Sequence, residues 1–128
     1  MKYLWFITLV TFPLLFNCQS ISKEIKIAPE ELNEVLQSNE GMQLVDVRTQ
    51  EEYQTSHLKN AANFDFYSKS FADSLKTLDK NKPVYVYCRS GGRSGKSVEE
   101  LKKLGFKEIY DLEGGILNWI DQGLEVSK

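Results

Sequence analysis

The chain has 128 residues, a length that suits a single domain. Its hydrophobic content of 41% and its formal net charge of −2 at pH 7 are those of an ordinary globular protein rather than a disordered one. The sequence contains neither a basic run nor a basic stripe with interleaved aromatic residues, so it lacks the signature of a nucleic-acid-binding protein.

The first residues have the pattern of an export signal. A positive start, Met1-Lys2, precedes an apolar run, Tyr3 to Phe16, which is short for a bilayer-spanning helix. The run leads into Asn17-Cys18 and resembles a bacterial lipoprotein signal. We therefore expect residues 1–17 to be a signal peptide and Cys18 to be the lipidated first residue of an exported protein, anchored in the periplasm or cell envelope.

Two other fates of this segment fit the sequence. An ordinary signal peptidase could cleave after Ser20 or Ser22, or the apolar run could stay as an uncleaved anchor. In the lipoprotein interpretation, residues 18–27 are a tether that contains a small edge strand at 25–27, and residues 28–126 form the folded domain.

Strands and helices alternate along the rest of the chain. Short apolar runs predict strands at 25–27, 43–47, within 57–64, 84–87 and 108–112. Helical patterns and caps predict helices at 29–36, 49–53, 68–78, 94–104 and 116–120. This alternation predicts an α/β fold with three layers, α/β/α, around a mainly parallel sheet of about five strands.

The 84–87 run delivers Cys88 into a loop of glycines and arginines that leads into the helix expected from Ser94. The loop reads Arg89-Ser90-Gly91-Gly92-Arg93-Ser94. Arginines and a helix N-terminus lower the pKa of a thiol, and glycines let backbone N–H groups turn toward a negative centre. The pattern predicts that Cys88 is a nucleophile, because an inert buried cysteine would be followed by neutral turn residues.

Residue counting separates two classes of cysteine enzyme. Cysteine phosphatases and one class of arsenate reductases use C-x5-R, which would place the arginine at position 94, where this chain has Ser94. The arginine is Arg93, and a loop shorter by one residue suits sulfur better than a tetrahedral phosphate. A thioredoxin-like role lacks its C-x-x-C. The spacings predict neither a metal site nor a cofactor.

Four segments resemble rhodanese-like sulfurtransferases, over about residues 28 to 125. They are Cys88–Ser94, Asp46-Val47-Arg48 with Glu52-Tyr53, Ser56–Asn63, and Leu112–Ile116 with Trp119. The chain departs from the family at Ser56 and Asn60, where glycines are usual.

The resemblance implies that Cys88 takes sulfur from thiosulfate or another sulfane donor as a persulfide. It then passes the sulfur to cyanide, a thiol or a protein acceptor. The loop residues Arg89 to Ser94 would bind the donor. Asp46 and Arg48 would support the loops, Arg48 through an ion pair with Glu51 or Glu52. A non-enzymatic persulfide carrier or interaction module of the envelope is the alternative.

Overall fold

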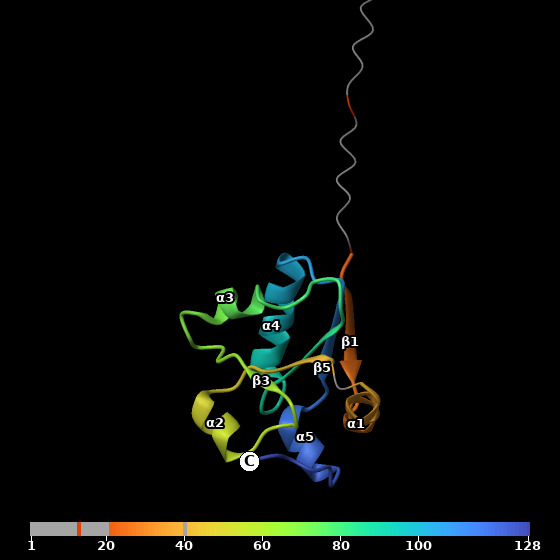
Figure 1. Cartoon of the computed structure of the whole chain (residues 1–128), viewed down its shortest axis with the longest axis vertical. Coiled ribbons are helices and arrows are strands. Elements are labelled where there is room, and N and C mark those ends of the chain that lie inside the picture. The colour runs from red at the N-terminus through yellow and green to blue at the C-terminus, as the bar shows by residue number, and fades with distance from the viewer. Residues whose placement is uncertain (1–12, 14–20, 40) are drawn as a thin grey trace, which may run out of the picture.

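The computed structural model describes residue 13, residues 21–39 and residues 41–128. The predicted lipidation site, Cys18, and all of the predicted signal peptide except Pro13 lie outside the described residues. The description below therefore concerns the folded domain (Figure 1).

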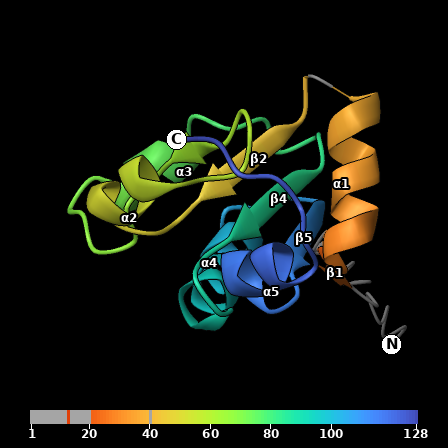
Figure 2. The same cartoon turned by 90° about the horizontal axis from the view of Figure 1, so that it is seen from below.

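Five strands form one parallel sheet in the order β1-β5-β4-β2-β3. They are β1 (Lys23–Ile27), β2 (Gln43–Asp46), β3 (Ala62–Asn63), β4 (Val84–Tyr87) and β5 (Glu108–Leu112). All four residues of β4 are buried, as expected of a central strand covered on both faces. Figure 2 shows β4 between β2 and β5.

Helices pack on both faces of the sheet and enclose two apolar cores. The helices are α1 (Pro29–Ser38), α2 (Gln50–Thr55), α3 (Phe71–Leu75), α4 (Gly92–Lys103) and α5 (Gly115–Asp121). The core on one face includes Leu75 of α3 and Leu101 of α4. The core on the other includes Leu32 of α1 and Trp119 of α5. The predicted α/β/α class with five strands is confirmed.

The structure corrects the predicted tether. Residues 23–27 form β1, which pairs with β5 along its whole length, and the Lys23 N–H donates to the Lys107 carbonyl at 2.8 Å. Of that prediction, only the small edge strand expected at 25–27 agrees with the structure, and the observed strand β1 is two residues longer. The folded domain therefore begins at residue 23 rather than 28.

Two helices differ from their predicted lengths. The helix expected at 68–78 is regular only over α3, because serine and threonine side chains bond to nearby main-chain groups on both sides of it. The helix expected from Ser94 begins two residues earlier, after Gly91, whose φ of 118° sets the turn.

The connections of the sheet diverge at β4. The chain leaves β2 toward β3 through α2, and it leaves β4 toward β5 through α4, in the opposite direction across the sheet. Parallel α/β sheets bind their ligands beyond the carboxyl ends of the strands at such a switch point. Cys88 follows the carboxyl end of β4 and therefore lies at this place.

Candidate active site

Cys88 is buried under its own loop. Its relative exposure is 1%, and its Sγ accepts a hydrogen bond from the Gly91 N–H at 3.1 Å. The neutral thiol also donates to the Ser94 Oγ at 3.5 Å. Once the thiol has lost its proton, that hydroxyl is in place to donate to the sulfur instead. The loop thus offers both main-chain and side-chain donors to a thiolate.

Burial and hydrogen bonding act on the pKa of Cys88 in opposite directions, and the net effect lowers it. Burial is the largest single influence and acts to raise the pKa. Hydrogen bonds from the Ser94 side chain and from the N–H groups of Ser94, Gly91 and Ser90 act against burial, and together they prevail. A lowered pKa increases the thiolate fraction at neutral pH, and the thiolate is the nucleophilic form.

The N-terminus of α4 supports the same charge. Because α4 starts at Gly92 rather than Ser94, its first turn lies closer to the sulfur than predicted. The free N–H groups of a helix N-terminus carry partial positive charge, which favours an anion beside them. The helix thereby adds to the stabilisation of a thiolate or a persulfide anion on Cys88.

The start of α5 forms hydrogen bonds with the main chain of the cysteine loop. The Ile116 N–H donates to the Cys88 carbonyl at 2.9 Å, and the Leu117 N–H donates to the Arg89 carbonyl at 3.2 Å. A Cβ placed on Gly115 would lie 2.3 Å from the Arg89 carbonyl oxygen, and Gly115 has a φ of 63°. Only glycine fits at this position, so the Gly114-Gly115 segment both starts a helix and brings its backbone against the loop.

The two loop arginines have different environments. Arg93 forms a two-pronged ion pair with Glu52, at 2.7 and 2.9 Å, and its guanidinium lies 5.8 Å from the ring centroid of Tyr67. Arg89 is exposed and forms no ion pair within 4.0 Å with the residues that the structure describes. Arg89 is thus the loop arginine whose charge is available to an incoming anion.

The predicted ion pair of Arg48 with Glu51 or Glu52 is wrong. The Arg48 guanidinium binds both oxygens of Asp46, with its Nη2 at 2.7 Å from Oδ2, and Nη2 also donates to the Ser56 carbonyl. Both side chains are buried, so each compensates the charge of the other at the end of β2. There Asp46 lies opposite Tyr87, the residue before the cysteine.

The single histidine belongs to the scaffold. His57 Nδ1 lies 2.9 Å from the Tyr53 carbonyl oxygen, and the imidazole stacks on the Tyr53 ring at 3.8 Å between centroids. Its main chain exchanges two hydrogen bonds with Ser127. These contacts give His57 a structural role.

One cavity of the domain lies away from the cysteine. It measures about 420 Å³ between α1, α5 and the C-terminal segment, and Leu36, Met42 and Trp119 contribute to its wall. Cys88 does not line it. We place the chemistry at Cys88, because the cavity walls carry no thiol and volume alone supplies no reaction.

Two functional contacts could not be found from the sequence. Glu52 fits the family segment, but nothing in the sequence indicates that it pairs with Arg93, 41 residues away. Tyr67, an exposed residue in an irregular loop, belongs to no motif.

Among the residues that the structure describes, no group of three or more His, Cys, Asp or Glu side chains could hold a metal ion. The same residues include no helix long and apolar enough to cross a membrane.

Comparison with known proteins agrees with the sequence resemblance. The family model described as "Rhodanese-like domain" matches residues 28–122. The chain belongs to the rhodanese-like domain family. A crystal structure of a rhodanese-like domain protein from Staphylococcus aureus is 35% identical and has a TM-score of 0.69. The match covers 81% of this chain and 99% of that one.

Two curated relatives are larger proteins. The probable adenylyltransferase/sulfurtransferase MoeZ of Mycobacterium tuberculosis is 31% identical over 79% of this chain. The tRNA uridine(34) hydroxylase of Protochlamydia amoebophila is 37% identical over 77% of it. The matched regions span only 26% and 33% of those proteins. The family therefore includes sulfurtransferases and proteins with another named activity.

Proposed function

We propose that this protein is a sulfurtransferase that carries sulfane sulfur as a persulfide on Cys88. The observation that carries the proposal is the environment of the Cys88 sulfur, whose pKa is lowered by hydrogen bonds despite burial. A thiolate stabilised in this way attacks divalent sulfur, and the same donors then stabilise the persulfide anion.

The reaction has two displacements. The Cys88 thiolate attacks the outer sulfur of thiosulfate; an S–S bond to the enzyme forms, the S–S bond of thiosulfate breaks, and sulfite leaves with the electron pair. Cyanide or a thiolate then attacks the terminal sulfur of the persulfide and releases the Cys88 thiolate. Neither step requires a cofactor. Arg89, which is exposed and follows Cys88 in the chain, carries a charge that attracts the oxyanion of the donor.

The chemistry of the chain leaves the persulfide intact between the two steps. Cys88 is a free cysteine, and the sequence contains only one other, Cys18. A resolving thiol in the same site would attack the persulfide and form a disulfide. A non-enzymatic persulfide carrier would have the same loop, so turnover with a small acceptor distinguishes the two functions.

We further propose that the protein is exported and held at a membrane by lipid on Cys18. The positive start and the apolar run from Tyr3 to Phe16 support this proposal. Incorporation of labelled palmitate into the wild type but not into Cys18→Ala is the expected result. Labelling of both proteins, or of neither, would contradict it.

The sulfur-transfer proposal is tested at the nucleophile. Wild type should release thiocyanate from thiosulfate and cyanide. The rate of release by Cys88→Ser should be at least about 1000-fold lower. Intact-mass spectrometry of thiosulfate-treated wild type should show one added sulfur atom, localised to Cys88. Equal turnover by wild type and Cys88→Ser overturns the mechanism. Sulfur loading without turnover would identify a carrier instead.

A further inference from the structure

We infer that the end of the domain opposite the cysteine loop is an interaction surface for an anionic lipid bilayer. This inference rests on the proposed anchor at Cys18 and goes beyond the sulfur chemistry. The surface, called here the lysine end, comprises Lys80, Lys82 and Lys107. Its proposed occupant is the headgroup layer of the membrane to which the chain is attached.

The parallel sheet places the lysine end at the amino ends of the strands. Lys82 precedes β4 and Lys107 precedes β5, while Cys88 follows the carboxyl end of β4. Main-chain hydrogen bonds join Lys23 N to the Lys107 carbonyl at 2.8 Å and Lys107 N to the Lys80 carbonyl at 3.3 Å. The start of β1 therefore lies directly beside the lysines, and the four-residue strand β4 separates them from the cysteine by about 13 Å.

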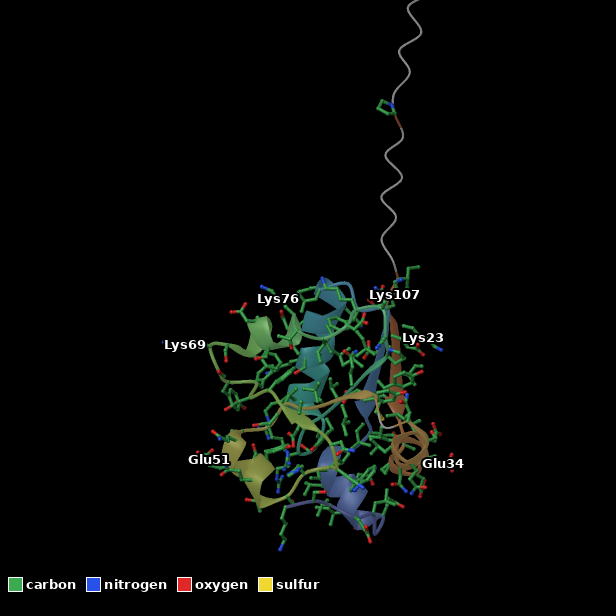
Figure 3. The ribbon with its side chains drawn as sticks, viewed as in Figure 1. Lys23, Glu34, Glu51, Lys69, Lys76 and Lys107 are labelled. Carbon is green, nitrogen blue, oxygen red and sulfur yellow. The ribbon has the colours of Figure 1, made fainter. Side chains whose placement is uncertain are left out.

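The length of chain before β1 brings this end close to the anchor. Four residues lie between Cys18 and Lys23, so the five Cα–Cα steps from one to the other span at most about 18 Å when fully extended. A lipid on Cys18 thus confines the start of β1 to a layer about two Debye lengths from the bilayer surface at physiological ionic strength. Figure 3 shows Lys23, Lys76 and Lys107 together at this end of the domain, with Glu34 and Glu51 toward the other.

The three lysines have charge available for a partner. Each is exposed, and none forms an ion pair within 4.0 Å with the described residues. Of the nearby carboxylates, Glu108 has Lys23 as its ionic partner at 3.9 Å, whereas Asp79 accepts from the Asn81 N–H and keeps its charge. The three lysines therefore exceed this acid by two charges. Lysines held near an anionic surface each strengthen binding about fivefold.

This orientation has a functional consequence. With its lysine end on the headgroups, the domain presents the cysteine loop, α2 and α5 away from the bilayer. Figure 1 shows α2 and α5 at the end of the domain opposite the start of β1. A water-soluble donor such as thiosulfate, which is an anion, then approaches the loop from the side facing away from the anionic surface. A lipid on Cys18 alone sets a distance from the bilayer but no orientation, so the lysine end supplies what the anchor does not.

Amine labelling of the reconstituted full chain tests the inference. The protein is incorporated into phosphatidylcholine vesicles, with or without 30% phosphatidylglycerol, and is acetylated with a water-soluble ester before peptide mass spectrometry. We expect acetylation of the lysine end to slow about threefold or more in the anionic vesicles and to recover at 0.5 M salt. The controls Lys59, Lys96 and Lys128, which are exposed elsewhere, should change less than twofold.

A pair of matched variants sharpens the test, with Lys76 as reporter. Lys80→Gln/Lys82→Gln/Lys107→Gln should lose the protection of Lys76, and Lys59→Gln/Lys96→Gln/Lys128→Gln should keep it. Equal labelling in both vesicle types overturns the inference while the anchor stands. Release of the chain from both vesicle types overturns the anchor and the inference together. Thiocyanate release, measured on the same samples, reports separately on sulfur transfer.

Discussion

At the scale of single residues, the environment of Cys88 reverses what burial alone would do. A thiol with 1% exposure is expected to hold its proton, since a buried anion is costly. The donors that offset this cost are the N–H groups of Ser90, Gly91 and Ser94 and the Ser94 hydroxyl. Ser94 has a relative exposure of 0%, so its hydroxyl is held in place by packing.

Removal of that hydroxyl should raise the pKa of Cys88. In Ser94→Ala the thiolate loses a hydrogen bond to a charged group, and we expect sulfur transfer at pH 6.5 to fall about tenfold. The loss should shrink as the pH rises, because the thiol then ionises without that hydrogen bond. The measurement is the pH profile of kcat/KM for thiosulfate. Ser97→Ala, a buried serine one turn along α4, is the control and should keep the wild-type profile. A uniform loss at every pH would contradict this role of Ser94.

At the scale of elements, one carboxylate connects α2 to α4. Glu52 accepts hydrogen bonds from the N–H and hydroxyl of Thr49, which completes the capping box of α2, and it also binds Arg93. The Arg93 guanidinium is the main cause that lowers the pKa of Glu52, from an ordinary value of 4.5 to about 2. The side chain that caps α2 thus also binds Arg93, a residue of the cysteine loop.

This coupling predicts a dependence of stability on acid. A lowered folded-state pKa stabilises the fold above the unfolded value, and the stabilisation is lost as the pH falls from about 4.5 toward 2. We expect Glu52→Gln to lose about 1 kcal/mol of unfolding free energy at pH 7, since the pair is partly exposed. The variant should approach the wild type as the pH is lowered through this window. Urea unfolding at several pH values measures both effects, and a difference that does not depend on pH would contradict the prediction.

The contact between α5 and the cysteine loop predicts a glycine requirement. Gly115→Ala adds a Cβ at a positive φ and against the Arg89 carbonyl, so we expect a loss of at least about 2 kcal/mol of stability together with reduced sulfur transfer. Gly123→Ala is the matched control. Gly123 has a similar φ of 75°, but a Cβ there meets nothing within 4 Å. Urea unfolding of the two variants separates the close approach from backbone strain, and equal losses would show that the approach is unimportant.

At the scale of the whole molecule, the edge strand β1 is held by a charge pair as well as by its main chain. Lys26 Nζ lies 2.5 Å from Oδ2 of Asp111, a fully buried carboxylate of β5. The other oxygen, Oδ1, has no hydrogen-bond partner among the described residues. The lysine is therefore the main compensation for a buried charge.

Loss of that lysine should destabilise the fold as a whole. We expect Lys26→Met to lower the unfolding free energy by about 3 kcal/mol, because Asp111 is left buried and unpaired. The double variant Lys26→Met/Asp111→Leu should recover most of the loss. Lys23→Met, which removes only an exposed pair with Glu108 at 3.9 Å, is the control and should change stability by less than about 1 kcal/mol. A double variant as unstable as Lys26→Met would contradict this account.

Local patterns of the sequence determined the elements and the nucleophile. Apolar runs and caps are set by neighbouring residues, so the five strands, the capping box of Thr49 and Glu52, and the loop after Cys88 follow from the sequence itself. The family departure at Asn60 also has a local explanation. Asn60 keeps a left-handed φ of 65°, which asparagine tolerates where glycine is usual.

Only the tertiary structure decided which side chains meet. Arg93 pairs with Glu52, Arg48 pairs with Asp46 and not with its predicted partners, Gly115 lies against the Arg89 carbonyl, and β1 joins β5 across more than 80 residues. The Arg48 pair is local, but its choice of Asp46 over Glu51 or Glu52 depends on how the buried end of β2 packs. The other three contacts depend on how strands are ordered in the sheet. Strand order is set by the burial of whole faces rather than by any local pattern, so it brings together residues whose spacing in the chain carries no trace of their contact.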